Sequence, residues 1–244
     1  MRFPLGVLIL VTSAATHDRT PVVGQPEPTL ASTLLVRLDE TARGPAPQPG
    51  GRALAFETER EGRWTIGLLD SLGARPRFLG VPFAARMPAW SPAGDELVVV
   101  APGRDSSDLV VVSPTTGQWR GVLRLAGELL HPAWSPGGRT IGFGLRLGND
   151  FGLRALDLAS GRVTPLIDRD GRDLWPRWDA TGRRMVFFSR RESPDDEVYV
   201  VDSAGATPRR LTTRAGHDFT PALSPSGNLV AVVSAVEASA GTPI

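Results

Sequence analysis

The side chains best suited to binding or reacting lie in short runs directly before a recurring proline. These runs combine acids, bases and aromatic rings, and their candidate members are Arg86, Glu128, His131, Arg172, Asp173, Trp175, His217 and Asp218. Asp173 and Asp218 occupy the same place, three residues before their prolines. An alternative role for these two acids is to cap turns or to pair with arginines such as Arg172, because paired surface charges are common. The runs predict a binding site only if the fold brings them together.

No residue is predicted to be catalytic, and no metal or cofactor is predicted. The sequence contains no cysteine, which excludes thiolate nucleophiles, disulfides and cysteine metal sites. It also contains no G-x-S-x-G around a serine, no H-E-x-x-H, no P-loop and no G-x-G-x-x-G. A pair of carboxylates suited to glycosidic chemistry is not excluded, but no spacing points to one.

The charge pattern predicts no nucleic acid partner. The formal net charge is +1, and the basic residues are scattered through the chain instead of forming a stripe. Hydrophobic residues make up 41% of the chain, which is enough to build a substantial core.

The N-terminus resembles a secretory signal. Arg2 precedes an apolar run over residues 3–11, and small residues follow in "TSAA". We therefore predict a signal peptide over residues 1–15, a Pro-rich linker over residues 16–31, and a periplasmic or secreted product. The alternative is that the apolar run forms a buried first strand. Without cysteine no lipid can be attached, so we expect no membrane insertion after signal cleavage.

The prolines that follow the polar runs mark a repeat, which predicts the fold that must position them. Successive copies stand 43 to 45 residues apart, at Pro45, Pro88, Pro132, Pro176 and Pro221. A period in the low forties made of short strands is typical of a propeller, with one blade per repeat. Each copy contains too much proline, glycine and β-branched residue for paired helices. Residues 32–244 are therefore predicted to form an all-β propeller of about five four-stranded blades.

Other slots of the repeat have structural roles. A turn glycine follows each anchor proline, at Gly51, Gly94, Gly138, Gly182 and Gly227, and can take the positive φ that closes a hairpin. Trp90, Trp134 and Trp178 share one slot, which Pro47 fills in the first copy and Leu223 in the last. A slot that accepts tryptophan, leucine or proline is predicted to pack between blades and not to bind a ligand.

The ring must also hide its last strand edge, because open edges pair with other chains. Val36 and Leu38 precede the first anchor at the spacing of an outer strand, which predicts that this N-terminal strand closes the final blade. After Val233 too few residues follow for a third strand, so either that blade has three strands or the chain is cut short. A single closed propeller is expected to be a monomer.

The repeats resemble those of the TolB-like propellers of bacterial envelope proteins. The closest copy, "WPRWDATGRRMVFFSRRESPDDEVYVVDSAGATPRRLT", runs from Trp175 to Thr212. The family's aspartate before the turn glycine is replaced here, at Ala93, Gly137, Thr181 and Ser226, so no role of that carboxylate is carried over. The separate α/β domain that precedes the propeller in the family's namesake also has no counterpart in this sequence.

Three functions are compatible with such a propeller, because one fold serves many roles. We favour an exported, non-catalytic scaffold that binds a protein or peptide partner at the mouth of the central channel. One alternative is a propeller fragment or regulatory domain of a prolyl oligopeptidase-type serine hydrolase, where propellers control the access of substrate. The other is a propeller that processes a small molecule or sugar.

Overall fold

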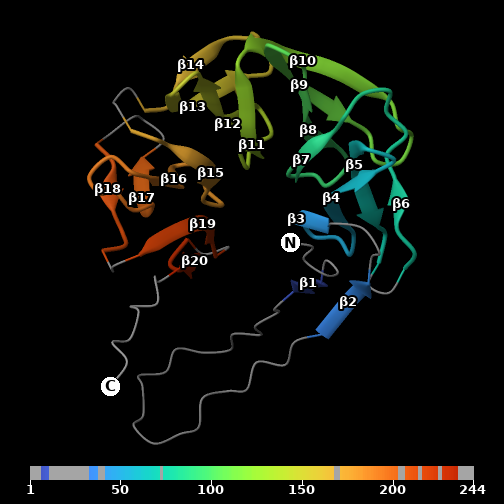
Figure 1. The fold of residues 1–244 in the computed structure, drawn as a ribbon, viewed down its shortest axis with the longest axis horizontal. Coiled ribbons are helices and arrows are strands. Elements are labelled where there is room, and N and C mark those ends of the chain that lie inside the picture. The colour runs from blue at the N-terminus through green and yellow to red at the C-terminus, as the bar shows by residue number, and fades with distance from the viewer. Residues whose placement is uncertain are drawn as a thin grey trace, which may run out of the picture.

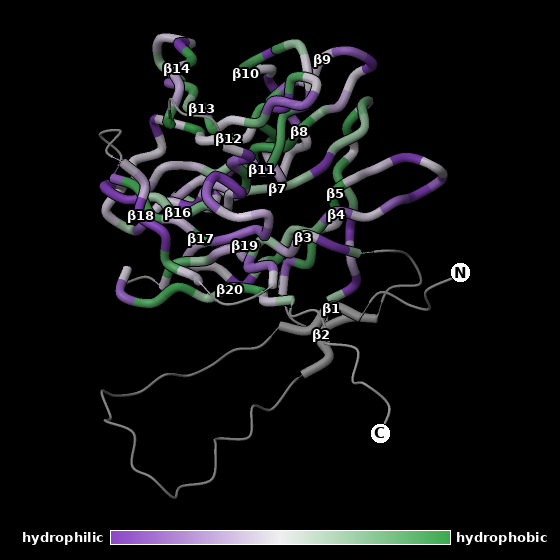
Figure 2. The backbone as a smooth tube through the Cα atoms, turned by 60° about the vertical axis from the view of Figure 1, so that its left-hand side comes forward, coloured by the Kyte–Doolittle hydropathy of each residue, from purple (hydrophilic) through white to green (hydrophobic). Residues whose placement is uncertain are grey.

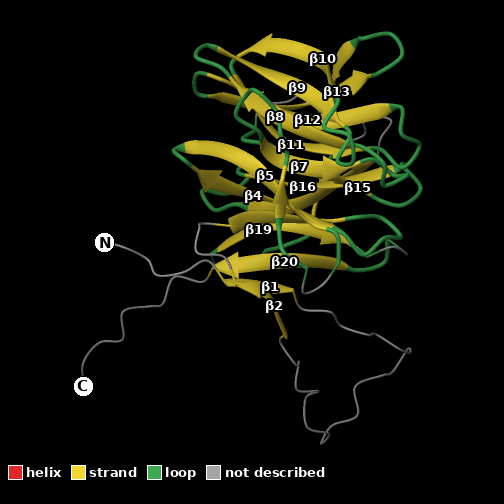
Figure 3. Ribbon diagram, turned by 90° about the vertical axis from the view of Figure 1, so that its right-hand side faces the viewer, coloured by secondary structure: helices red, strands yellow, loops and turns green. Residues whose placement is uncertain are grey.

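The computed structural model describes residues 7–10, 33–37, 42–71, 74–167, 171–202, 207–213, 216–224 and 227–235. These residues form strands joined by loops, and the described part of the chain contains no helix (Figure 3). Four of its sheets have four antiparallel strands each, which we call blades 1 to 4. A two-stranded sheet near the C-terminus forms blade 5. The fold-class prediction of an all-β propeller is confirmed.

The strands of each blade follow one another along the chain. Blade 1 consists of β3 (Ala42–Pro47), β4 (Leu54–Arg60), β5 (Arg63–Leu69) and β6 (Arg77–Phe78). Blade 2 consists of β7 (Arg86–Trp90), β8 (Leu97–Pro102), β9 (Ser106–Val112) and β10 (Trp119–Ala126). Blade 3 consists of β11 (Glu128–Trp134), β12 (Thr140–Leu147), β13 (Asp150–Asp157) and β14 (Val163–Pro165). Blade 4 consists of β15 (Leu174–Trp178), β16 (Arg184–Ser189), β17 (Glu197–Asp202) and β18 (Arg209–Arg210), and blade 5 of β19 (His217–Leu223) and β20 (Val230–Ala235).

The blades are arranged radially around a common axis (Figure 1). The first strand of each blade lies nearest the centre, and each packs against the next: β3 on β7, β7 on β11, β11 on β15 and β15 on β19. Each of these inner strands contains one anchor proline. Pro88, Pro132, Pro176 and Pro221 are all buried.

The same turn joins the first two strands of four blades. The N–H of Gly94 donates to Ser91 O at 2.9 Å, and the same bond recurs at Gly138, Gly182 and Gly227. All four glycines have φ between 69° and 74°, a region that side chains with a Cβ rarely adopt. The glycine slot of the repeat is therefore set by the backbone of the turn.

The core lies between the blades. Leu97 and Val99 of β8 pack with Ile66 and Leu68 of blade 1, whereas their neighbour Val98 packs with blade 3. Both faces of β8 are thus covered, and Figure 2 shows its backbone in the colour of hydrophobic residues. Full burial of such side chains stabilises the fold by about 1.5–3 kcal/mol each. Trp90, Trp134 and Trp178 contact the three successive core clusters.

The predicted closure of the last blade has to be corrected. The N-terminal strand, β2 (Thr33–Arg37), pairs with β1 (Val7–Leu10) in a separate two-stranded sheet, and β1 contacts β3 of blade 1. Among the described strands, β20 pairs with β19 alone. The prediction gave residues 7–10 to the signal peptide. The alternative, that the apolar run forms a strand, agrees with β1, but its pairing with β2 was not foreseen. Pairing of the two segments satisfies backbone hydrogen bonds that an open strand edge leaves free. Leu38, the predicted linker and residues 236–244 lie outside the described residues.

Candidate functional site

The predicted site residues gather at the face of the ring on which the inner strands begin. We call this the upper face. The first residue of an inner strand pairs with the end of the second strand, as Glu128 does with Arg146 and His217 with Ala235. The hairpins β4–β5, β8–β9, β12–β13 and β16–β17 therefore lie on the upper face as well. The turn glycines lie on the opposite, lower face.

A backbone irregularity recurs at the upper part of all five inner strands. The residue directly before each anchor proline has positive φ, and the pairing register shifts at the same place. The five residues and their φ values are Gly44 (59°), Met87 (53°), His131 (48°), Trp175 (62°) and Thr220 (50°). A residue before proline is normally extended, so this conformation is strained for the four residues that carry a Cβ. The extra residue of each bulge redirects one side chain.

The residues before the anchor prolines of blades 2, 3 and 4 connect neighbouring blades through their backbone and side chains. We call Met87, His131 and Trp175 the inner row. The backbone N–H of Met87 donates to Glu57 Oε2 of blade 1 at 3.0 Å. The backbone nitrogen of His131 lies 3.3 Å from the sulfur of Met87. The rings of His131 and Trp175 stack with centroids 3.9 Å apart and planes tilted by 33°. The inner row therefore forms a continuous contact from blade 1 to blade 4.

Cationic groups surround the inner row. Glu57 is buried and forms ion pairs with Arg43 (Nε–Oε1, 3.1 Å) and Arg86 (Nε–Oε2, 3.5 Å). Burial, together with the positive charges of Arg177 and Arg86, lowers the pKa of His131 to about 3. His131 is therefore a neutral, aromatic member of the row at physiological pH.

Asp173 and Asp218, the two equivalent acids of the predicted site, are buried inside their blades. Asp173 accepts hydrogen bonds from Arg191 Nη2 at 2.7 and 2.6 Å, and Asp218 accepts one from the hydroxyl of Ser234. The partner of Asp173 is thus an arginine of the β16–β17 loop and not Arg172. Neither carboxylate is exposed to a ligand approaching from solvent.

The other predicted residues lie closer to the surface. Glu128 pairs with Arg146 (Oε2–Nη2, 2.6 Å). His217 Nδ1 accepts the N–H of Asp196 at 3.0 Å. The guanidinium of Arg172 lies 4.7 Å from the ring centroid of Phe151, on the neighbouring blade. The predicted residues thus fall into three groups. Asp173 and Asp218 are buried structural acids, His131 and Trp175 belong to the inner row, and Glu128, Arg172 and His217 form what we call the outer rim.

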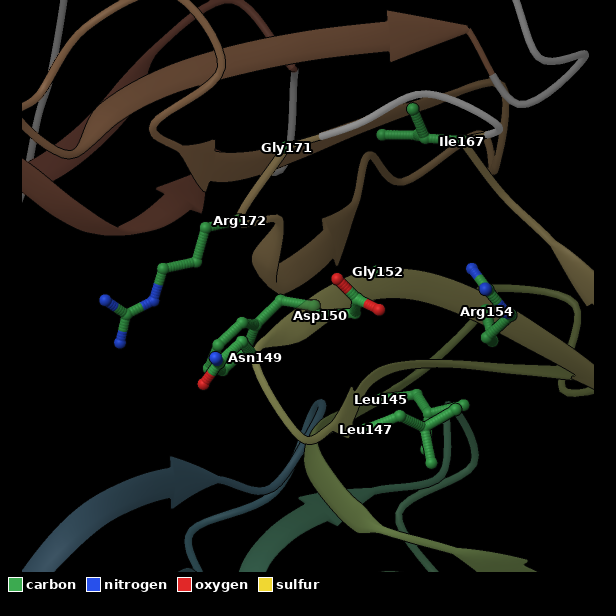
Figure 4. A pocket seen from close by; sticks show the side chains of 10 residues that line it. Leu145, Leu147, Asn149, Asp150, Gly152, Arg154, Ile167, Gly171 and Arg172 are labelled. Atoms are coloured by element: carbon green, nitrogen blue, oxygen red, sulfur yellow. The ribbon is translucent and has the colours of Figure 1, made fainter.

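The rim contains a depression of about 460 Å³ between the β12–β13 hairpin and the residues that lead into β15 (Figure 4). Its lining is part apolar and part charged: Leu145, Leu147, Asn149, Asp150, Phe151, Gly152, Arg154, Ile167, Gly171 and Arg172. Leu147 at the hairpin tip is 48% exposed. Only Arg172 of this set was singled out from the sequence. For the other lining residues, the sequence feature that could have indicated the site is Leu147, an apolar residue directly before the polar turn "GND".

Among the described residues, no three His, Asp or Glu side chains are grouped so that they could hold a metal ion. The described residues also contain no helix with the length and apolar character needed to span a lipid bilayer. The described upper face offers apolar and aromatic surface, guanidinium groups and a neutral imidazole, which are groups that bind ligands by contact and hydrogen bonding.

The radial sheets and the repeated inner-strand bulges define the protein as a β-propeller. Its sequence matches the TolB beta propeller domain over residues 57–241. The chain therefore belongs to the TolB-like propeller family, as its repeats predicted.

Individual relatives agree with this assignment. The chain is 28% identical over 204 residues to a protein TolB homolog of Chlorobium luteolum, covering 76% of this chain and 46% of that protein. It is 37% identical over 106 residues to a protein TolB homolog of Chlorobium chlorochromatii, covering 43% of this chain and 23% of that protein. It thus spans less than half the length of these relatives. TolB from Acinetobacter baumannii has a similar fold, with a TM-score of 0.70 at 21% identity, over 79% of this chain and 49% of that one.

Proposed function

We propose that this chain is an exported, non-catalytic propeller that binds a segment of a protein partner on its upper face. The observation that carries the proposal is the rim depression beside Phe151, where exposed apolar surface and guanidinium groups occur together. Protein interfaces combine an apolar anchor with a polar rim in this way.

The depression has the size and composition to hold one or two side chains of a partner. A volume of about 460 Å³ lies within the usual range of ligand pockets. Leu147 and Phe151 supply contact area, and the Arg172 guanidinium lies over the Phe151 ring in a cation–π contact. An apolar side chain of the partner is therefore expected to rest against Leu147, with its backbone near Arg172.

Export is part of the proposal and is supported by the signal-like order of charge, apolar run and small residues at the N-terminus. Membership of the TolB-like family supports an envelope location. The partner is accordingly sought among envelope proteins.

The test is capture of a partner from an envelope extract by three forms of the purified protein: wild type, Leu147→Lys and Leu229→Lys. Leu229 is a matched control, because it is also an exposed leucine, at 68%, and lies at the turn between β19 and β20 on the lower face. Loss of one buried leucine contact costs about 1.5–3 kcal/mol, so Leu147→Lys is expected to reduce capture by roughly tenfold or more. Leu229→Lys is expected to capture as the wild type does. Equal capture by both variants contradicts the upper-face proposal.

A further inference from the structure

Arg177 occupies a position that the repeat otherwise gives to a small residue. It directly follows the anchor proline of blade 4, and the equivalent residues of the other copies are Ala46, Ala89, Ala133 and Ala222. Four copies of the blade therefore fold with a methyl group at this place. The arginine of blade 4 is not required by the blade architecture.

The guanidinium of Arg177 has no acidic partner among the described residues. Its Nη1 donates to Pro176 O at 3.0 Å, and its guanidinium carbon lies 5.4 Å from the ring centroid of Trp175. The side chain is half-buried, and burial lowers its pKa to about 10. A partly buried charge without a counterion opposes folding, because it loses hydration without gaining an ion pair.

Other unsatisfied polar groups lie on the same row. Arg177 contacts Trp175, which stacks on His131, and the positive charges of Arg177 and Arg86 both act on the imidazole of His131. His131 Nδ1 is a buried atom without a hydrogen-bond partner in the described structure, and Arg86 Nε, which is also buried, lies 3.5 Å from Glu57 Oε2 without a hydrogen bond. Buried polar atoms are normally satisfied, so each such atom calls for an explanation.

The charges of this cluster do not balance. Three guanidinium groups, those of Arg43, Arg86 and Arg177, are associated with the inner row. Glu57 is the carboxylate that contacts the first two of them, and it does not contact Arg177. Within the described part of the chain, Arg177 is therefore the member of this group that contacts no carboxylate.

We propose that Arg177, together with His131 and Arg86, forms a binding site for a carboxylate group next to the ring of Trp175. A guanidinium presents a planar fork of N–H donors that matches the two oxygens of a carboxylate. A neutral imidazole can donate one further N–H. We assign the carboxylate to the bound partner segment, as a C-terminus or an acidic side chain, and this assignment of its source rests on the proposed function.

The site itself is tested with small probes that need no partner. N-acetylglycine carries the carboxylate, N-acetylglycinamide is its neutral counterpart, and both are titrated by calorimetry at constant ionic strength. We expect the acid to bind and the amide not to bind. Arg177→Ala, which installs the residue of the other four copies, and Arg177→Gln are expected to weaken binding of the acid by roughly tenfold or more.

Arg162→Ala is the matched control, because Arg162 is an exposed arginine in the lower-face turn between β13 and β14. It is expected to bind the acid as the wild type does. Equal binding of acid and amide, or unchanged binding by both Arg177 variants, overturns the site. Tighter binding of inorganic phosphate than of N-acetylglycine overturns the assignment to a carboxylate.

The source of the carboxylate is tested separately in the capture assay. Arg177→Ala is expected to reduce capture of the partner as well as binding of N-acetylglycine. If it loses the acid but captures the partner at the wild-type level, the partner is not the source of the carboxylate. If N-acetylglycine binds at Arg177 while Leu147→Lys leaves capture intact, the upper-face docking proposal fails and the carboxylate site stands.

Discussion

Replacing Asp173 with asparagine is predicted to destabilise the protein strongly, although Asp173 belongs to the polar run that the sequence marked as a binding site. Its carboxylate receives two hydrogen bonds from Arg191 Nη2, at 2.7 and 2.6 Å. The side chains of Asp173 and Arg191 are 1% and 8% exposed. Asparagine keeps the shape of aspartate but removes the charge, so the guanidinium stays buried without an anion.

The magnitude follows from burial. Removing one partner of a buried ion pair costs about 3–5 kcal/mol, because the other charge is left without compensation. The surface pair Asp70–Arg77 provides a matched control. It has the same residue types, with Nε–Oδ2 and Nη2–Oδ1 distances of 3.0 and 2.9 Å, but its side chains are 62% and 42% exposed. Asp70→Asn is therefore expected to cost less than about 1 kcal/mol.

The assay is equilibrium unfolding in urea, supported by thermal melting. For a domain of this size, 1 kcal/mol shifts the melting temperature by roughly 2–4 °C, so Asp173→Asn is expected to melt about 6–20 °C lower and Asp70→Asn at most about 4 °C lower. A double variant, Asp173→Leu with Arg191→Met, is expected to recover most of the loss, since an apolar pair can replace a buried ion pair. Equal losses for Asp173→Asn and Asp70→Asn refute the reasoning, because burial would then not decide the cost.

Two other predictions concern the inner row and the turns. The pKa of His131 is about 3 in the folded protein and roughly 6.5 when unfolded, so the unfolded state takes up the proton first as the pH falls. The neutral His131 imidazole thus contributes to stability fully above pH 6.5, and this contribution is lost as the pH falls toward 3. Between pH 7 and pH 5, the free energy of unfolding of the wild type is expected to fall by about 2 kcal/mol more than that of His131→Asn. This difference is measured by urea unfolding at both pH values, and parallel curves would exclude it. Gly94→Ala is expected to cost about 1–3 kcal/mol in the same assay, because Gly94 has φ of 74° and a Cβ would lie 3.2 Å from Pro49 O. Gly121→Ala, where a Cβ meets nothing within 4 Å, should change stability by less than about 0.5 kcal/mol, and similar costs at the two glycines would contradict the backbone explanation.

The blade pattern was accessible from the sequence because it depends on local geometry. Proline and glycine limit φ within a few residues, and apolar side chains two positions apart lie on one face of a strand. The glycine of the turn at Gly94 and the buried pair Leu97 and Val99 follow from these rules. The same reasoning located the inner strands that form the upper face.

The pairing of the N-terminal strand was not accessible in the same way. Several strand edges were available to residues 33–37, including the outer strands of the blades and β20, and hydrogen-bonding potential alone does not rank them. The structure selects β1, the segment that the sequence assigned to export. The positive φ of Met87, His131 and Trp175 was also missed, because the residue before a proline is expected to be extended.

The sequence by itself determined the number of repeats, the strands and turns within each repeat, and the family. The tertiary structure decided which polar side chains are structural and which face the upper surface. Asp173 and Asp218 occupy equivalent places in the repeat, yet they find different partners, Arg191 and Ser234. Arg177 stands among alanines in the repeat, and it adds an unbalanced charge to the inner row because three successive blades bring Arg86, His131 and Trp175 to the same axis. Short-range sterics fix the blades, whereas the environment of a charge depends on which blades meet at the centre.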